Sequence, residues 1–275
     1  MSATSARRSR LSKGFAKQGW RRYVALGDSS TEGMDDPDSD GGYRGWADRL
    51  SEHLAAYQNG IEYANLAIRG RTTNQILTTQ LPVALSLKPD LATVLAGMND
   101  ILGSTFDPVA VAAEVEFMFR ALADAGTRVL TFTLPDPTPN LPFTRRMQPR
   151  LVAFNAELRA AAERSGALMV DIAEFTGGSD PRLWSDDRLH GNSLGHARVA
   201  HALAHGLDLP GFDHSWREPL PPADPGPLVE SVRANLVWAH QYALPWFWRN
   251  LRGRSSGDGL SPKRPQPAPV RLSGG

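Results

Sequence analysis

The chain has 275 residues, and 41% of them are hydrophobic, which is enough for one large globular domain or two small ones. It contains no cysteine, which excludes disulfide bonds, a thiol nucleophile and a cysteine metal site and fits a reducing compartment. The formal net charge is only +1, so the composition gives no indication of a specific nucleic-acid partner.

Charge is unevenly distributed along the chain. Residues 1–22 carry seven basic residues and no acidic one, and residues 249–275 carry six basic residues and a single acidic one. The part between them holds 17 basic and 28 acidic residues. We interpret residues 1–22 as a disordered tail and residues 249–275 as a flexible tail. Such tails are either solvated or make weak peripheral contact with anionic membranes.

The N-terminal pair Arg7-Arg8 resembles part of an export signal, but the residues after it never form the apolar core that export requires. No uncharged run approaches the roughly 18 residues needed to span a bilayer. We therefore expect a cytoplasmic protein.

Strands and helices alternate regularly between residues 23 and 209. Apolar runs predict strands at 23–26, 62–68, 91–96, 128–134 and 167–172. Amphipathic spacing predicts helices at 43–57, 74–85, 108–125, 151–165 and 194–205. This alternation predicts an α/β domain, a three-layer α/β/α sandwich around a five-stranded parallel sheet with the flavodoxin-like strand order 2-1-3-4-5.

The composition changes after Leu209. Residues 210–248 combine a proline-rich spacer with a segment whose apolar pattern predicts a helix at 228–241. The segment carries an aromatic cluster of Trp238, Trp246, Phe247 and Trp248. This cluster either packs against the domain or anchors the chain to a membrane interface or partner.

The first predicted strand ends abruptly in the sequence VALGDSSTEG, residues 24–33. Gly27 stops the apolar run, and Asp28 and Ser29 follow in a turn that leads into a helix. Reactive groups gather at such carboxyl ends of parallel strands. Ser29 is therefore a candidate nucleophile, although Asp28 and Ser29 could also merely close the turn or cap the helix.

Two further strands end in polar turns that contain Gly70 and Asn99. In the order 2-1-3-4-5 the first strand lies between the second and the third, which places Gly70 and Asn99 on either side of Ser29. The backbone amides of Ser29 and Gly70 and the side-chain amide of Asn99 are candidate donors to an oxyanion.

A serine nucleophile needs a base and a group that orients this base. His190 lies in a polar loop after the last predicted strand, and Asp187 precedes it by three residues. A D-x-x-H pair in one loop can bring the carboxylate back to the imidazole. We therefore predict that Ser29, His190 and Asp187 form one site.

Taken in order, four sequence blocks resemble the SGNH, or GDSL-type, hydrolase family of esterases and lipases. They are Gly27-Asp28-Ser29 with Thr31-Glu32-Gly33, Asn65 with Gly70, Gly97-Met98-Asn99-Asp100, and Asp187-Arg188-Leu189-His190. Ser30 stands where the family name has leucine. The resemblance implies Ser29 as nucleophile, His190 as base, Asp187 as its orienting residue, and Ser29, Gly70 and Asn99 as the oxyanion hole.

The resemblance implies a serine esterase that acts on small-molecule esters through an acyl-enzyme. An acyltransferase or a carbohydrate or metabolite O-deacetylase with the same triad remains an alternative, as does a silent binding module with basic docking tails. We expect no cofactor and no metal ion. His201 and His205 have the spacing of a metal pair, but no carboxylate on that helix completes the site. The sequence does not determine the oligomeric state.

Overall fold

The computed structural model describes residues 19–140, 147–222, 238–243 and 255–270. Most of the predicted tail at 1–22 and most of the predicted helix at 228–241 lie outside these ranges. So do Trp246, Phe247 and Trp248.

A central sheet of six strands has the order β5-β4-β3-β1-β2-β6. The strands are β1 (Arg22–Leu26), β2 (Glu62–Asn65), β3 (Leu91–Val94), β4 (Arg128–Phe132), β5 (Leu168–Val170) and β6 (Arg264–Pro269). The first five are parallel and follow the predicted order 2-1-3-4-5. The α/β fold is confirmed, but the predicted strand number is wrong because β6 adds an antiparallel edge strand beside β2.

The apolar runs of the sequence become the buried centre of this sheet. All four residues of β3 are buried, as expected for a strand covered on both faces. In the neighbouring strands, the rings of Tyr23 and Tyr63 stack with their centroids 5.0 Å apart. The hydroxyl of Tyr23 lies 2.8 Å from the hydroxyl of Thr93, so its polar end is hydrogen-bonded inside the core.

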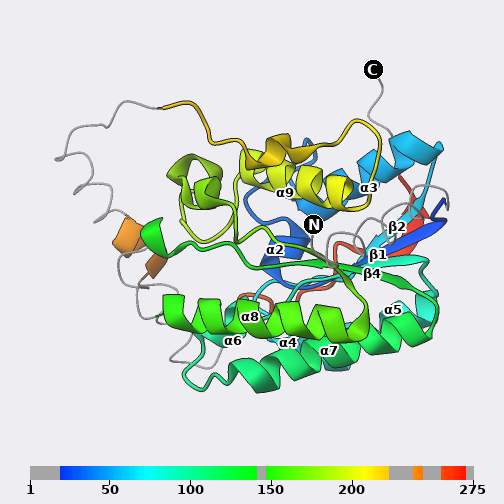
Figure 1. Ribbon diagram of the computed structural model, residues 1–275, viewed down its shortest axis with the longest axis horizontal. Coiled ribbons are helices and arrows are strands. Elements are labelled where there is room, and N and C mark those ends of the chain that lie inside the picture. The colour runs from blue at the N-terminus through cyan, green and yellow to red at the C-terminus, as the bar shows by residue number, and fades with distance from the viewer. Residues whose placement is uncertain (1–18, 141–146, 223–237, 244–254, 271–275) are drawn as a thin grey trace, which may run out of the picture.

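Helices cover both faces of the sheet. The α-helices are α2 (Ser29–Glu32), α3 (Gly45–Gln58), α4 (Thr73–Gln75), α5 (Leu81–Leu87), α6 (Met98–Leu102), α7 (Pro108–Asp124), α8 (Gln148–Ser165) and α9 (Ser193–Gly206). Figure 1 shows α3 and α9 on one side of the sheet and α7 and α8 on the other. Both pairs pack closely together, which gives the predicted three layers. Apolar residues at helical spacing explain the burial, since Trp46, Leu50 and Leu54 all face the core from α3.

The helix predicted at 74–85 is divided into three parts. Between α4 and α5 the chain forms a π-helical turn, η2 (Ile76–Gln80). Pro82 lies in the first turn of α5 and has no N–H to donate to the preceding turn. Just before Pro82, the amide of Leu81 donates to the carbonyl of Ile76, five residues earlier, rather than to the carbonyl four residues earlier as in an α-helix.

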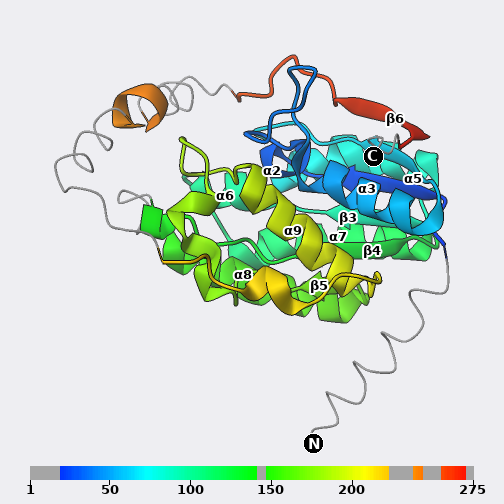
Figure 2. The same ribbon diagram turned by 90° about the horizontal axis from the view of Figure 1, so that it is seen from above.

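The C-terminal strand β6 lies within the stretch that composition assigns to a flexible tail. That prediction is wrong for residues 264–269, whose backbone pairs with β2 along the edge seen in Figure 2. Lys263 explains much of this docking, because its ammonium group forms an ion pair with Asp48 and donates to the carbonyls of Tyr43 and Arg44. Burial raises the pKa of Asp48 to about 6 despite the positive charge of Lys263.

The N-terminal boundary also differs from the prediction. Trp20 is buried in the core, and its backbone amide donates to Gln58 Oε1 at 2.9 Å. Arg22 belongs to β1. The folded part therefore begins before residue 23.

Three further elements matter for the site: the 3-10 turns η6 (Pro181–Leu183) and η7 (His214–Arg217), and the π-helical turn η8 (Ala239–Ala243).

Among the helices that the structure describes, none combines the length and the apolar character that a membrane crossing requires.

Candidate active site

Ser29 lies at the carboxyl end of β1 as the first residue of α2. Asp28 caps this helix, since its Oδ1 accepts a hydrogen bond from the amide of Ser30 at 3.1 Å. Gly27 makes the turn possible, because a Cβ there would lie 2.2 Å from Thr31 Oγ1 and 2.9 Å from the carbonyl oxygen of Leu95. The sharp turn presents the Ser29 side chain to a cavity.

Gln80 holds this turn from the side, although the sequence analysis does not identify it. Its Oε1 accepts from the amide of Gly27 at 2.9 Å, and its Nε2 donates to the carbonyl of Gly27 at 2.8 Å. Gln80 is buried at the end of η2, so the π-helical turn aims the amide at Gly27. A lone glutamine in a predicted helix carries no signal for this contact.

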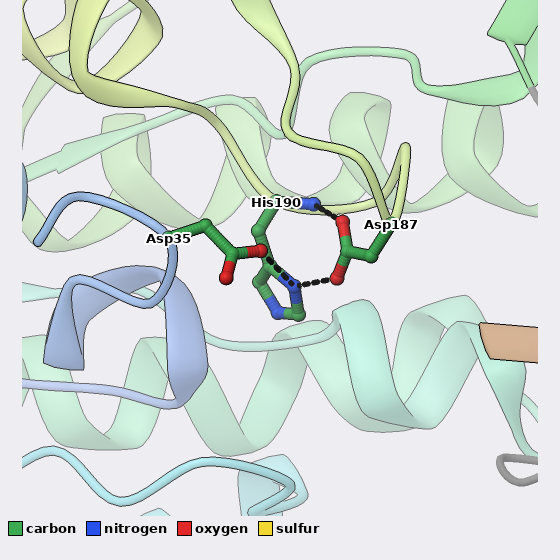
Figure 3. Close-up of side chains that lie close together, drawn as sticks. All are labelled: Asp35, Asp187 and His190. Carbon is green, nitrogen blue, oxygen red and sulfur yellow. Dashed lines mark hydrogen bonds and ion pairs between the residues drawn. The ribbon is translucent and has the colours of Figure 1, made fainter. Parts of the chain in front are cut away.

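His190 and Asp187 meet Ser29 from the loop that follows β5. His190 Nε2 lies 2.7 Å from Ser29 Oγ. On the other side of the ring, His190 Nδ1 lies 2.5 Å from Asp187 Oδ2, as Figure 3 shows. The other oxygen of Asp187 accepts from the amides of Leu189 and His190 at 2.8 and 2.9 Å. With Asp187 accepting from Nδ1, the nitrogen Nε2 is left to accept the proton of Ser29.

Charge at the site favours an ionised Asp187 and a basic His190. Burial lowers the pKa of His190, but the hydrogen bond and negative charge of Asp187 outweigh it, and the pKa is raised above its ordinary value. For Asp187, burial raises the pKa, but the hydrogen bond and charge of His190 hold it well below the usual range. This arrangement can take a proton from Ser29 and stabilise the imidazolium that results.

Asp35 is a second carboxylate beside His190, and the sequence analysis does not place it there. Its Oδ2 lies 3.8 Å from His190 Nδ1, across the ring from Asp187 (Figure 3). Ser185 Oγ lies 2.7 Å from an oxygen of each carboxylate and so links the two. Asp35 has a φ of 66°, a left-handed conformation that aspartate tolerates better than most residues. The aspartate-rich sequence around Asp35 predicts a polar, exposed loop. It does not predict the contact with His190, because the two residues are too distant in sequence for a local pattern to reveal it.

We expect Asp35→Asn to move the acidic limb of the kcat/KM profile to lower pH. The carboxylates that act on His190 are Asp187, Asp35 and Asp28, and each favours the imidazolium. His190 accepts a proton only when it is neutral, so activity falls as the pH drops through its pKa. Removing one negative charge lowers that pKa and extends activity to more acidic solution. The measurement is kcat/KM against pH for a small soluble ester.

The matched control is Asp40→Asn, which removes a charge from an exposed side chain of the same loop. Its profile should follow that of the unmodified chain. An acidic limb that stays in place in Asp35→Asn would rule out an electrostatic effect of Asp35 on His190.

Gly70 lies beside Ser29 and lines the same cavity, as the strand order predicts. Its φ is 72°, a conformation that favours glycine, and a Cβ there would lie 2.3 Å from Ser255 Oγ and would displace that side chain. Within the part of the chain that the structure describes, the backbone amides of Ser29 and Gly70 donate to no protein acceptor. Both amides can therefore donate to a ligand.

Asn99 lines the cavity on the β3 side of Ser29, at the start of α6. Its Nδ2 donates to Asp28 Oδ2 at 3.1 Å and to the carbonyl of Arg71 at 3.0 Å. The next residue, Asp100, accepts from the amide and hydroxyl of Thr73 at 2.9 and 2.8 Å. Both amide hydrogens of Asn99 have protein acceptors here, so a ligand can receive one only if one of these bonds is shared or given up.

Burial raises the pKa of Asp28 to about 6, and the hydrogen bond from the Ser30 amide and the charge of His190 only partly offset it. Asp28 therefore takes up a proton at a higher pH than an exposed aspartate does. Its contact with Asn99 survives protonation, because the carbonyl oxygen of a carboxylic acid still accepts.

The cavity beside Ser29 has a volume of about 830 Å³, within the usual range for small-molecule sites. Its walls are mainly apolar and come from the carboxyl ends of the strands and the loops around them. Representative lining residues are Leu95, Met98, Phe132, Ile172, Trp184 and Trp216. Ser29 and His190 also line this mainly apolar cavity, so the site suits an apolar molecule with a reactive polar group.

The histidines of α9 have packing roles. His196 is buried, its Nδ1 accepts from the amide of Trp46 at 3.1 Å, and its Nε2 lies 3.0 Å from the carbonyl of Met34. Burial lowers its pKa to about 4, so the ring is neutral. The ring of His201 packs against Phe212 with centroids 5.1 Å apart.

The sequence model of the GDSL-like lipase/acylhydrolase family matches residues 25–198. The chain belongs to this family. Membership makes it a serine hydrolase that acts on ester bonds. No curated protein sequence matches the chain.

Solved structures share the fold of this GDSL-like hydrolase. LAE5, an alpha/beta hydrolase enzyme from the metagenome of Lake Arreo, has a TM-score of 0.60 at 21% identity, covering 71% of this chain and 99% of its own. TesA has a TM-score of 0.55 at 24% identity, covering 68% and 98%. Axe2, an acetylxylan esterase from Geobacillus stearothermophilus, has a TM-score of 0.57 at 17% identity, covering 71% and 95%.

Proposed function

We propose that this hydrolase cleaves carboxylic esters through an acyl-enzyme on Ser29, with His190 as the base and Asp187 as the group that orients it. The observation that carries the proposal is the continuous chain of two short contacts, 2.7 Å from Ser29 Oγ to His190 Nε2 and 2.5 Å from His190 Nδ1 to Asp187 Oδ2. A nucleophile, a base and an orienting carboxylate in this arrangement are what acyl transfer by serine requires.

The reaction proceeds in two stages. In the first, Ser29 Oγ attacks the ester carbonyl while its proton passes to His190 Nε2; the tetrahedral intermediate then collapses, and the imidazolium protonates the departing alcohol. In the second, His190 takes a proton from water as its oxygen attacks the acyl carbon, and then returns that proton to Ser29 Oγ as the acid leaves. Asp187 stays ionised throughout and stabilises each imidazolium.

We assign the oxyanion hole to the backbone amides of Ser29 and Gly70 and the side-chain amide of Asn99. The two backbone amides donate to no acceptor elsewhere in the described chain, which supports the assignment. Asn99 joins them when the developing charge competes for the hydrogen that it gives to Arg71 in the free enzyme. A donor that strengthens its bond only at the transition state contributes to rate rather than to substrate binding.

An ester panel assayed with the full chain and with Ser29→Ala tests this function. We expect the unmodified chain to hydrolyse p-nitrophenyl acetate, butyrate and octanoate, and the variant to lose activity on all three. A fluorophosphonate probe should label the unmodified chain, with the mass increase on the peptide that contains Ser29. Residual activity or labelling elsewhere in Ser29→Ala would overturn the assignment.

The same assay separates hydrolysis from acyl transfer. Methanol or glycerol is added at increasing concentration, and free acid and new ester are both measured. Free acid as the main product in aqueous buffer supports a hydrolase. A new ester that dominates at low alcohol concentration would identify an acyltransferase instead.

A further inference from the structure

Part of the cavity wall comes from beyond the family match, which ends at residue 198. Trp238, Gln241 and Tyr242, from η8 and the residue before it, line the cavity together with Ser256. These residues belong to the C-terminal part of the chain, which the sequence analysis separates from the hydrolase domain. The cavity is therefore completed by a segment that lies outside the residues matched by the family model.

Trp238 fixes this segment to the loop that carries the catalytic pair. Its side chain is buried, and its indole Nε1 donates to the backbone carbonyl of Asp187 at 2.8 Å. The guanidinium of Arg188 lies 5.3 Å from the centre of the indole ring, a cation–π distance. Two successive residues of the D-x-x-H loop thus contact one indole.

Tyr242 lies at the same side of the cavity and is partly exposed. The pKa of Tyr242 is raised by partial burial and by the negative charges of Asp186, Asp187 and Asp35. Trp238 and Tyr242 together form an aromatic wall beside the His190 loop. Gly70 and Asn99, the assigned oxyanion donors, follow β2 and β3 instead.

In the proposed reaction, the alcohol part of the ester lies on the side of the site where Trp238 and Tyr242 are found. His190 must protonate the departing alcohol, so the alcohol oxygen has to lie within hydrogen-bond reach of Nε2. The alcohol group therefore projects toward the side of the site that the His190 loop forms. Aromatic side chains on that side offer large flat surfaces to an apolar or aromatic group.

We propose that Trp238 and Tyr242 form a subsite for the alcohol part of the ester and favour esters of bulky apolar or aromatic alcohols. This inference rests on the proposed function, because it uses the role of His190 as the acid that releases the alcohol. The acyl group occupies the remaining apolar cavity and does not contact this wall.

Two series of alkyl esters separate the subsites. In the first, the acyl group is always acetyl and the alcohol is ethanol, hexanol or 2-phenylethanol, which are primary alcohols of similar acidity. In the second, the alcohol is always ethanol and the acid is acetic or hexanoic acid. The parameter is kcat/KM, because it covers the steps up to departure of the alcohol.

The variants are Trp238→Ala, Tyr242→Ala and Trp238→Phe, made in the full chain. In both alanine variants we expect the preference for 2-phenylethyl acetate over ethyl acetate to fall by about tenfold, the usual size of a lost apolar pocket contact. The preference for ethyl hexanoate over ethyl acetate should stay unchanged. Trp238→Phe keeps an aromatic ring but loses the bond to Asp187, and it should retain most of the alcohol preference.

The matched control is Phe117→Ala, which removes an aromatic ring that is 60% exposed on α7 and does not line the cavity. Its preferences should equal those of the unmodified chain.

An equal loss on all esters in Trp238→Ala and Tyr242→Ala would overturn the subsite and leave these residues as supports of the Asp187 loop. A change in the acyl series instead of the alcohol series would also overturn it. Activity in Ser29→Ala would refute the proposed function, whereas an inactive Ser29→Ala with unaltered preferences in the wall variants refutes the subsite alone.

Discussion

Alanine in place of Ser29 or His190 is expected to lower kcat by on the order of 10⁶-fold, and the double variant should be about as slow as either single variant. In the proposed mechanism the two residues, whose side chains lie 2.7 Å apart, act as one catalytic unit, so removing either leaves the other without a partner in the reaction. Non-additivity is therefore the decisive result. It is measured by kcat for a p-nitrophenyl ester with all three variants at high enzyme concentration.

The fold should survive these substitutions, because both residues lie in turns at the rim of the sheet rather than in its core. Circular dichroism and thermal unfolding of each variant provide the control. Losses that multiply in the double variant would mean that Ser29 and His190 act independently, and the assignment of nucleophile and base would then fail.

Asn99→Ala should lower kcat by about 10²–10³ with little change in KM. The physical reason is that the Asn99 amide donates a hydrogen bond to negative charge that exists only in the transition state, and this bond stabilises the ground-state ester little. Steady-state kinetics on p-nitrophenyl butyrate separate the two parameters. A raised KM at constant kcat would make Asn99 a residue that binds substrate rather than one that stabilises an oxyanion.

Asn99 also holds Asp28, so the substitution could disturb the turn before Ser29. The fluorophosphonate reaction of Ser29 monitors that turn independently of turnover of the ester. Asn74→Ala is a matched control, because Asn74 is an exposed asparagine whose side chain pairs with Glu114 at the surface. It should leave both kinetic parameters unaltered.

Much of the parallel sheet could be predicted from local sequence. Each predicted strand is a short apolar run that ends at a polar or glycine-containing turn, and this pattern depends only on neighbouring residues. The position of Ser29 between Gly70 and Asn99 follows from the strand order, because carboxyl ends of adjacent parallel strands share one edge. The pairing of Asp187 with His190 also lies within a single loop. The strands and the Asp187–His190 pair therefore required only local sequence, whereas the placement of Gly70 and Asn99 also required an assumed strand order.

Predictions made from composition were wrong where a polar or proline-rich stretch is ordered by contacts with residues far away in the sequence. Five of the six residues at 264–269 are polar or proline, which is typical of a flexible tail, yet the edge of β2 offers unpaired backbone groups that they satisfy. For Trp238 the sequence left open packing against the domain or anchoring elsewhere, and its bond to the carbonyl of Asp187 shows packing against the domain. A helical pattern at 228–241 says nothing about which surface its aromatic residues meet.

The sequence by itself determined the class of sheet, the order of its parallel strands and the residues that could perform acyl transfer. The class of sheet follows from periodicity, the strand order from analogy with flavodoxin-like sheets, and the residue roles from the resemblance to the GDSL-type family. Only the tertiary structure decided that Asp35 lies 3.8 Å from His190 and that Trp238 and Tyr242 wall the cavity beside it. These contacts join segments far apart along the chain, and their geometry depends on how all the intervening elements pack.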